Sequence, residues 1–312
     1  MTLQISLQVQ YALFGILGLL IVASAAIFGL VKLRPTRDYT ELRLRVRTWW
    51  VIILIFVLAI AFDRTVSVIV LAFVSFLAFK EYLSLIPTRR ADRRVLFWAY
   101  LAIPIQYYWV AIAWYGMFII FVPVYMFLWL PLQMVLIGET KGFLRAAGTL
   151  HWGLMTTVFS LSHMAYLLAL PESGNPNGGG DALLLYLVLL TELNDVAQFI
   201  SGKTFGRHKV TPTVSPKKTV EGLIGGIIVT TVLAYVLAPW LTPLTRLEAI
   251  AAGMIIGLFG FIGDVTVSAV KRDIGVKDSG NLLPGHGGVL DRLDSLTYTA
   301  PLFLHFVRYL HY

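Results

Sequence analysis

The chain has 312 residues, of which 58% are hydrophobic and only 13% are charged. Soluble domains have about 45–50% apolar and about 25% charged residues, so this composition excludes an ordinary soluble protein and indicates an integral membrane protein. The chain has no cysteine, which excludes a disulfide framework and a cysteine-based zinc site.

Long apolar runs separated by short polar segments predict an all-α, polytopic chain with about ten transmembrane helices. In chain order the predicted spans are 8–33, 49–62, 65–79, 95–112, 116–137, 150–170, 182–201, 222–241, 248–270 and 295–311. The second and third spans are short, and Asp63 and Arg64 lie between them. A re-entrant hairpin is therefore an open alternative to two crossings at this point.

Basic residues predict the orientation of the spans. All but three of the 25 Lys and Arg residues fall in the segments 32–47, 80–94, 141–145, 203–218 and 271–292. Because loops rich in Lys and Arg stay on the cytoplasmic side, we expect these five segments inside the cell and both termini outside. The net charge of +8 is then mostly a topology signal, and we expect no nucleic-acid partner.

Three polar segments interrupt the apolar pattern at the predicted cytoplasmic face: 191–199, 201–222 and 263–295. In the last of them, Asp264, Ser268 and Lys271 have the i, i+4, i+7 spacing that lines one stripe of a helix. Asp291 and Asp294 are three residues apart and share the face on which the last helix begins. We therefore expect one polar site, formed by all three segments.

This pattern predicts a magnesium and phosphate site. Carboxylates that converge from two helices are costly unless a cation lies among them, and oxygen-only ligands favour Mg²⁺, which also binds substrate phosphates. Glycines at 275, 280, 285, 287 and 288 leave backbone N–H groups free to contact anionic oxygens. For any single aspartate, a surface ion pair with Lys271, Arg272 or Lys277 is the simpler alternative. An acid within an apolar span is a functional candidate as well, and Asp195 is one.

The ordered set resembles the signature of the phosphatidate cytidylyltransferase (CDP-diacylglycerol synthase) family. The similar positions are Ser268, Lys271, Arg272, Lys277, Asp278, Pro284, His286, Gly287, Gly288, Asp291, Arg292 and Asp294. Upstream, the stretches 202–209 and 215–222 are similar to a second conserved region of that family. The resemblance covers about a third of the chain, 195–295.

The resemblance implies that the chain transfers the cytidylyl group of CTP to phosphatidate, giving CDP-diacylglycerol and pyrophosphate with Mg²⁺ as cofactor. A second, monovalent cation is an open addition. The implied metal ligands are Asp264, Asp291 and Asp294. The implied catalytic residues are Asp264, Lys271, Asp278, His286, Asp291 and Asp294. The implied substrate-binding residues are Asp195, Lys203, Ser215, Lys217, Lys218, Ser268, Arg272, Lys277 and Arg292.

The resemblance also divides the chain into parts. Residues 1–48 are expected to be an additional N-terminal transmembrane helix with a basic cytoplasmic loop, 49–181 further membrane helices, and 182–312 the catalytic membrane domain. The chain departs from the family pattern at Ala197 and Gln198, which replace a Gly-Ala pair there, and at Val267, which replaces a usual glutamate. A specialised relative that acts on another lipid phosphate is therefore an open alternative.

Two other functions also fit the residues. One is a CTP-dependent lipid kinase, which would transfer the γ-phosphate to a lipid alcohol. The other is a membrane transporter, because buried acids and glycine-interrupted helices also describe transport sites. In every case we expect an integral protein of a bacterial-type inner or plasma membrane, with membrane lipids around it and its site facing the cytoplasm. A homodimer is an open form of assembly.

Overall fold

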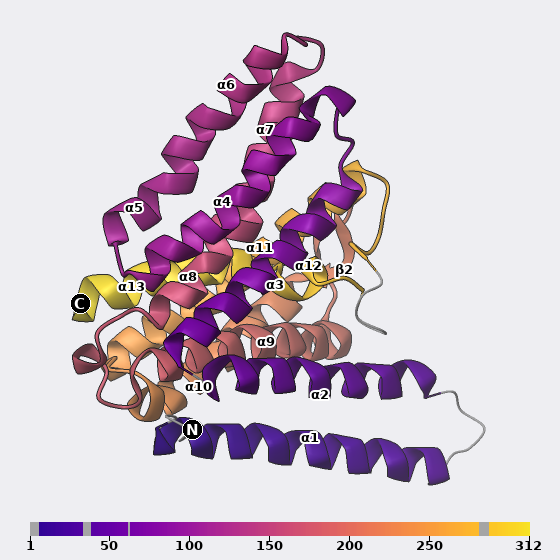
Figure 1. Ribbon diagram of the computed structural model, residues 1–312. Coiled ribbons are helices and arrows are strands. Elements are labelled where there is room, and N and C mark those ends of the chain that lie inside the picture. The colour runs from indigo at the N-terminus through magenta and orange to yellow at the C-terminus, as the bar shows by residue number, and fades with distance from the viewer. Residues whose placement is uncertain (1–5, 34–38, 62, 281–286) are drawn as a thin grey trace.

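A computed structural model describes residues 6–33, 39–61, 63–280 and 287–312 (Figure 1). The first half is helical, with bounds α1 Leu7–Leu33, α2 Thr40–Ala61, α3 Arg64–Leu85, η1 Arg90–Asp92, α4 Arg93–Ala111, α5 Tyr115–Ile120, η2 Phe121–Met126, α6 Phe127–Ile137, α7 Phe143–Leu154, η3 Met155–Phe159 and α8 Ser160–Leu167. The second half has the elements η4 Glu172–Gly174, α9 Gly179–Phe205, β1 Lys209–Thr211, β2 Ser215–Thr219, α10 Val220–Leu241, α11 Arg246–Asp273, α12 Leu290–Leu293 and α13 Leu296–His311. The predicted all-α architecture is confirmed apart from the antiparallel β1–β2 hairpin.

Helices occupy all ten predicted spans. Among the described residues, six helical stretches are long and apolar enough to cross a membrane: α1, α3, the continuous stretch Tyr115–Ile137, α9, α10 and α11. The chain is therefore an integral membrane protein by length and composition of its helices, and the count of ten crossings stays a prediction. Helices α2 and α3 have 22 residues each, about 33 Å of helix, which favours two helices over a re-entrant hairpin.

Polar caps explain where three of the helices begin. Asp63 accepts a hydrogen bond from the Thr65 N–H and so caps α3. Thr219 accepts one from the Gly222 N–H at 3.1 Å and caps α10. Thr245 and Glu248 form a reciprocal capping box at the start of α11. Each cap satisfies N–H groups that have no partner within the helix.

A row of glycines on α11 lets four helices pack closely. A Cβ atom on Gly253 would lie 2.6 Å from the Thr231 Cα atom of α10. A Cβ atom on Gly263 would lie 2.5 Å from the Asp294 carbonyl oxygen, immediately before α13. Small residues are the usual means of close helix approach in membranes, where apolar lipid competes with apolar side chains. The row therefore brings Asp264, the residue after Gly263, close to the start of α13.

Buried polar contacts join the same helices. The side-chain amide of Asn194, on α9, donates to the Gly257 carbonyl of α11 at 3.2 Å and accepts from the Thr230 hydroxyl of α10 at 3.1 Å. The hydroxyls of Thr191 and Thr299 lie 3.1 Å apart and connect α9 with α13. Such bonds fix the register of the helices, since sliding one helix along another would leave buried polar atoms unpaired.

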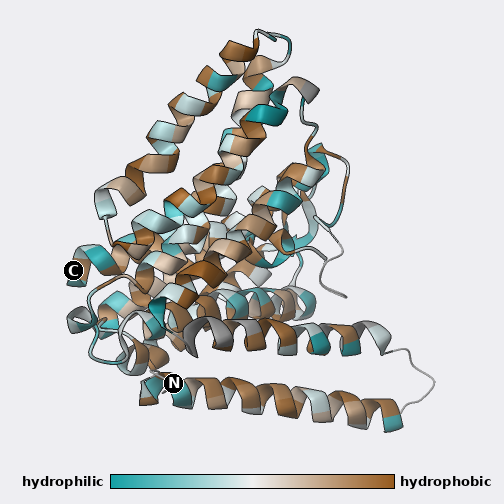
Figure 2. Cartoon of the chain, in the orientation of Figure 1, coloured by the Kyte–Doolittle hydropathy of each residue, from teal (hydrophilic) through white to brown (hydrophobic). Residues whose placement is uncertain are grey.

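The turns gather at two opposite ends of the bundle (Figure 1). At one end, Asn177 donates to the Thr242 carbonyl, and Gly174 lies against the Tyr312 ring. At the other end, Arg272 donates to the Val214 carbonyl. The helices between the ends are largely apolar, and polar residues gather around α12 and β2 (Figure 2).

The three basic residues outside the five basic segments have local partners. Arg64 donates to the Val110 and Ala111 carbonyls at the end of α4. Arg246 donates to the Tyr235 carbonyl at 2.6 Å and lies over its ring. The Arg308 guanidinium lies 3.6 Å from the centre of the Tyr115 ring. These contacts satisfy each charge locally, which explains how three arginines stand apart from the basic segments.

The buried apolar side chains form one contacting cluster, whose members range along the sequence from Val9 to Val307 and lie on both sides of the predicted boundary at residue 181. The helices before and after that residue therefore share one core. The division into 1–48, 49–181 and 182–312 stays a prediction about function.

The glycine packing gives a testable expectation. Gly253→Val should destabilise the protein by about 1–3 kcal/mol, the usual cost of overpacking, because its side chain would press on the α10 backbone. Gly15→Val is the matched control, since a Cβ atom there meets nothing within 4 Å. Thermal unfolding of both purified variants in detergent measures the difference. Equal melting temperatures would contradict the packing described for α10 and α11.

Candidate active site

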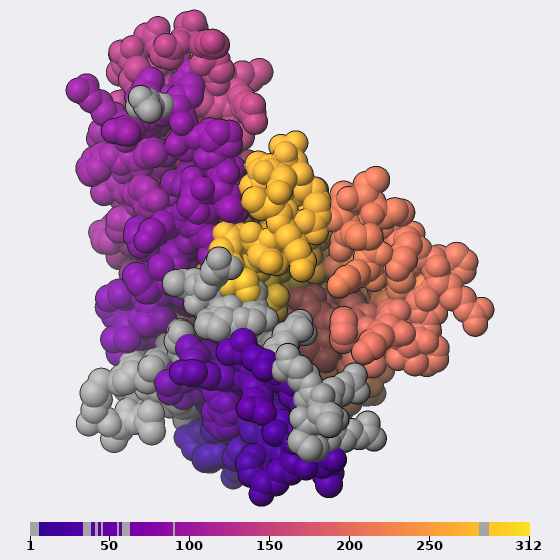
Figure 3. Space-filling model, turned by 90° about the vertical axis from the view of Figure 1, so that its right-hand side faces the viewer, coloured from indigo at the N-terminus to yellow at the C-terminus, as the bar shows by residue number. Residues whose placement is uncertain are grey.

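The polar segments predicted to form one site do meet at one end of the bundle. They lie where α9 and α11 end, where the β1–β2 hairpin connects α9 to α10, and where α12 precedes α13. Figure 3 looks onto this end and shows a hollow between the orange-yellow C-terminal segment and the salmon segment that contains the hairpin.

The predicted stripe on α11 is confirmed. The Ser268 hydroxyl donates to Asp264 Oδ1 at 3.2 Å, one helical turn away. Lys218, on β2, places its Nζ atom 2.5 Å from Asp264 Oδ2 and 4.6 Å from the centre of the Phe261 ring. The hairpin thus supplies a cation to the first acid of the stripe, and an aromatic face supports that cation.

Lys271, one turn further along α11, forms a buried ion pair with Asp291. The distance from Lys271 Nζ to Asp291 Oδ1 is 2.6 Å, and the two side chains are 10% and 6% exposed. Asp291 Oδ2 accepts hydrogen bonds from the N–H groups of Ser279, at 2.8 Å, and Gly288, at 2.9 Å. Burial works to raise the pKa of Asp291, but Lys271 and the two N–H groups outweigh it and leave the pKa below its usual value.

The surroundings of Asp294 shift its pKa in the opposite direction to that of Asp291. Its Oδ1 atom accepts a hydrogen bond from the Ser295 N–H at 2.8 Å. Burial, and then the negative charges of Asp264 and Asp195, raise the pKa of Asp294 well above its usual value. The Ser295 hydroxyl donates to both carboxylate oxygens of Asp195, at 3.2 and 3.0 Å. We call Asp195, Asp264 and Asp294 the acid cluster, because three elements bring them under one another's electrostatic influence.

Arg292 lies among these acids. Its positive charge lowers the pKa of Asp294, though less than Lys271 does. Its Nε atom is buried and has no hydrogen-bond partner within the described part of the chain. A buried donor without a partner is costly, so this guanidinium is suited to an anionic oxygen that comes from outside the chain.

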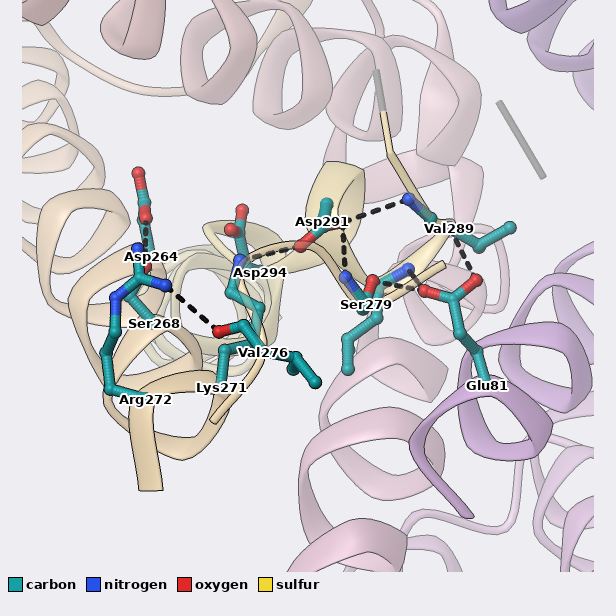
Figure 4. A network of polar contacts seen from close by, with 12 residues as sticks. Glu81, Asp264, Ser268, Lys271, Arg272, Val276, Ser279, Val289, Asp291 and Asp294 are labelled. Carbon is teal, nitrogen blue, oxygen red and sulfur yellow. Dashed lines mark hydrogen bonds and ion pairs between the residues drawn. The ribbon is translucent and has the colours of Figure 1, made fainter. Parts of the chain in front are cut away.

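Glu81, at the end of α3, reaches the same region from the first half of the chain (Figure 4). Its carboxylate accepts hydrogen bonds from the N–H groups of Val289, at 2.8 Å, and Leu290, at 3.1 Å, and from the Ser279 hydroxyl. Ser279 therefore lies between two carboxylates, with its hydroxyl on Glu81 and its N–H on Asp291. The sequence offered one signal for Glu81, the triplet Lys80-Glu81-Tyr82 at a helix end, which is similar to the family in that half of the chain. No spacing relates Glu81 to a partner some 200 residues away.

The remaining predicted substrate-binding and catalytic residues are mostly at the rim. Lys203, Lys217, Arg272, Lys277 and Asp278 are exposed, and Ser215 is half-buried at the start of β2. Lys203 lies 5.8 Å from the exposed Phe199 ring, and Arg272 holds the Val214 and Val276 carbonyls. His286 lies outside the described residues, and its catalytic role stays a prediction.

The acidic residues fit a Mg²⁺ ion that arrives with a phosphate. Within the described residues, no three His, Asp or Glu side chains are arranged to hold a metal ion among themselves. Asp291 is engaged by Lys271 and two N–H groups, and Asp264 is engaged by Lys218 and Ser268. Asp294 has no ion-pair partner among the described residues, and the negative charge of Asp264 raises its pKa, so an added cation would relieve the repulsion between these two hard oxygen donors. Mg²⁺ commonly binds through one or two carboxylates plus substrate phosphates, and these two suit that mode.

Comparisons with known proteins show the family of the chain. The cytidylyltransferase family profile matches residues 43–310. YnbB of Escherichia coli (strain K12), an uncharacterized protein, is 45% identical over 305 residues, which cover 98% of this chain and 100% of YnbB. Phosphatidate cytidylyltransferases of Staphylococcus haemolyticus and Haemophilus influenzae are 42% and 43% identical over 120 and 129 residues. Those two matches cover 38% and 40% of this chain and 46% and 45% of the relatives, less than half of either protein.

The contrast between Asp291 and Asp294 predicts opposite effects on stability. Asp291→Asn should destabilise the protein by about 3–5 kcal/mol, because it leaves the Lys271 ammonium buried without its partner. Asp294→Asn should leave the stability unchanged or raise it, because it removes a buried carboxylate from beside two others. Melting temperatures of both variants in Mg²⁺-free detergent solution test this expectation. Equal losses would contradict the different settings described for the two residues.

Proposed function

The chain belongs to the cytidylyltransferase family, and we propose that it transfers the cytidylyl group of CTP to phosphatidate or a closely related lipid phosphate. The observation that carries the proposal is the meeting of three acids with Lys218, Lys271 and Arg292 at one end of an apolar helix bundle. Relatives named phosphatidate cytidylyltransferase support the choice of the lipid substrate.

The proposed reaction needs positioning and charge stabilisation more than a general base. A lipid phosphate oxygen forms a bond to the α-phosphorus of CTP, the bond from that phosphorus to the β-phosphate oxygen breaks, and pyrophosphate leaves with the electron pair. A phosphate monoester has a second pKa of about 6, so the nucleophile is already largely ionised near neutral pH. The barrier then comes from bringing two polyanions together and from charge on the leaving group.

Named residues can meet these needs. Lys218 and Arg292, beside the acid cluster, are suited to the phosphate oxygens that approach it, and Lys203, Lys217 and Lys277 at the rim are suited to the triphosphate of CTP. Asp264 and Asp294 would hold Mg²⁺ when Lys218 moves from Asp264 to a phosphate, and Asp291 would join them only if Lys271 released it. When bound, the ion would neutralise phosphate charge during the transfer.

The two substrates explain why such a site belongs at a membrane surface. CTP is water-soluble, whereas the acyl chains of phosphatidate stay in the bilayer, so their phosphates can meet only near the interface. We propose that this surface is the cytoplasmic one, because the basic segments favour that side. The orientation and the bacterial-type inner membrane are parts of the same proposal.

Labelled CTP separates the proposed reaction from its alternatives. With α-³²P-labelled CTP and phosphatidate, the label should enter the lipid product, and with γ-labelled CTP it should enter pyrophosphate. Both products should require Mg²⁺, and Lys218→Ala should reduce their formation at least about tenfold, because it removes a cation beside the leaving charge. In a parallel reaction with a lipid alcohol, label from the γ-position in the lipid would indicate a kinase instead, and absence of product from both reactions in a folded preparation would favour transport.

The orientation has its own test, which uses the absence of native cysteine. Ser173 and Lys209 are both exposed. Ser173 belongs to η4, which contacts the C-terminal Tyr312, and Lys209 belongs to β1, which pairs with β2; the C-terminus and β2 lie at opposite ends of the bundle in Figure 1. In intact cells an impermeant thiol reagent should label Ser173→Cys, and it should label Lys209→Cys only after the membrane is opened. Labelling of Lys209→Cys in intact cells would reverse the proposed orientation.

A further inference from the structure

We propose that Glu81 of α3 is a positioning residue for the catalytic segment 287–294, and this inference rests on the proposed cytidylyl transfer. Glu81 touches no reacting atom. Its carboxylate accepts the N–H groups of Val289 and Leu290 and the hydroxyl of Ser279, so both of its oxygens hold backbone or side chain of this region. The first half of the chain thereby contributes to a site whose other described members come from the second half.

Two glycines show how closely the carboxylate approaches. A Cβ atom on Gly280 would lie 3.1 Å from both Cδ and Oε2 of Glu81, and all three of its nearest atoms would belong to Glu81. A Cβ atom on Gly288 would overlap Glu81 Oε1 and the Ser279 hydroxyl. Glycine at 280 and 288 therefore leaves the space that the Glu81 carboxylate occupies.

The contacts of Glu81 continue directly into the site. Gly288, which precedes the two residues that Glu81 holds, donates its N–H to Asp291, and Asp291 pairs with Lys271. Asp294 of the acid cluster follows one helical turn after Leu290. A shift at Val289 and Leu290 would therefore displace Asp291 and Asp294 together, while Asp195, Asp264 and Lys218 stay on their own elements.

A carboxylate suits this position for a chemical reason. Its two oxygens accept three hydrogen bonds, and hydrogen bonds to a charged acceptor are stronger than those to a neutral one. Glutamine has a single acceptor oxygen, and its NH₂ group would face an N–H donor. Glu81→Gln is thus a nearly isosteric change that removes some of these hydrogen bonds, and Glu81→Ala removes all three.

The first measurement needs no substrate. Hydrogen exchange in the purified protein should speed up at the Val289 and Leu290 amides by roughly tenfold to a hundredfold in Glu81→Ala, as expected for loss of a charged acceptor. Glu139→Ala is the matched control, because Glu139 also accepts a backbone N–H, from Lys141, in the exposed turn between α6 and α7. Unchanged exchange at 289 and 290 would overturn the inference, whatever the reaction is.

The second measurement uses the proposed reaction. Glu81→Gln should lower kcat about tenfold to a hundredfold and leave the KM for CTP within about threefold, because misplacement of reacting groups acts on the chemical step. Gly280→Ala should lower kcat in the native chain and have no further effect in Glu81→Ala, since the side chain it presses on is gone. Faster exchange with unchanged kcat, or additive effects of Gly280→Ala and Glu81→Ala, would overturn the positioning role. A wild-type protein that makes no CDP-lipid while exchange responds as expected would instead overturn the proposed function.

Discussion

Charge placed inside an apolar helix bundle must be compensated where it lies, and the polar end of this protein is organised by that requirement. Removing a carboxylate or an ammonium from water costs several kcal/mol, more than helix propensity or packing can offset at one residue. Asp291 meets the requirement within the chain, through Lys271 and two N–H groups. Asp294 does not, since its buried carboxylate lies under the influence of two further negative charges.

Asp291 and Asp294 therefore differ in how far the chain itself compensates their negative charge. Asp291, paired and hydrogen-bonded, fixes the chain around Ser279 and Gly288. In the acid cluster, Asp294 lies under the influence of two like charges, and a bound cation would relieve that repulsion. Glycines on α11 make this possible, because only a residue without a side chain at 263 lets Asp264 lie next to the backbone of Asp294.

The positions that depart from the family pattern fit the packing of the helices. Val267 is 1% exposed and belongs to the apolar core, and Ala197 is 8% exposed on α9. Gln198 is also 8% exposed and lies against Gly226 of α10. All three residues are therefore buried among the packed helices.

Composition and periodicity were enough to determine the class of the protein, the positions of its helices and the stripe of Asp264, Ser268 and Lys271, because helix period and hydropathy are local properties. The same reasoning could predict that the aspartates meet in one site, but it could not predict which of them is paired with a lysine. Lys271 pairs with Asp291 across 20 residues, and Glu81 holds Val289 across 208. Which acid has a cationic partner within the chain and which has none depends on distances between helices. Only the tertiary structure sets those distances, since they result from packing between residues far apart in the sequence.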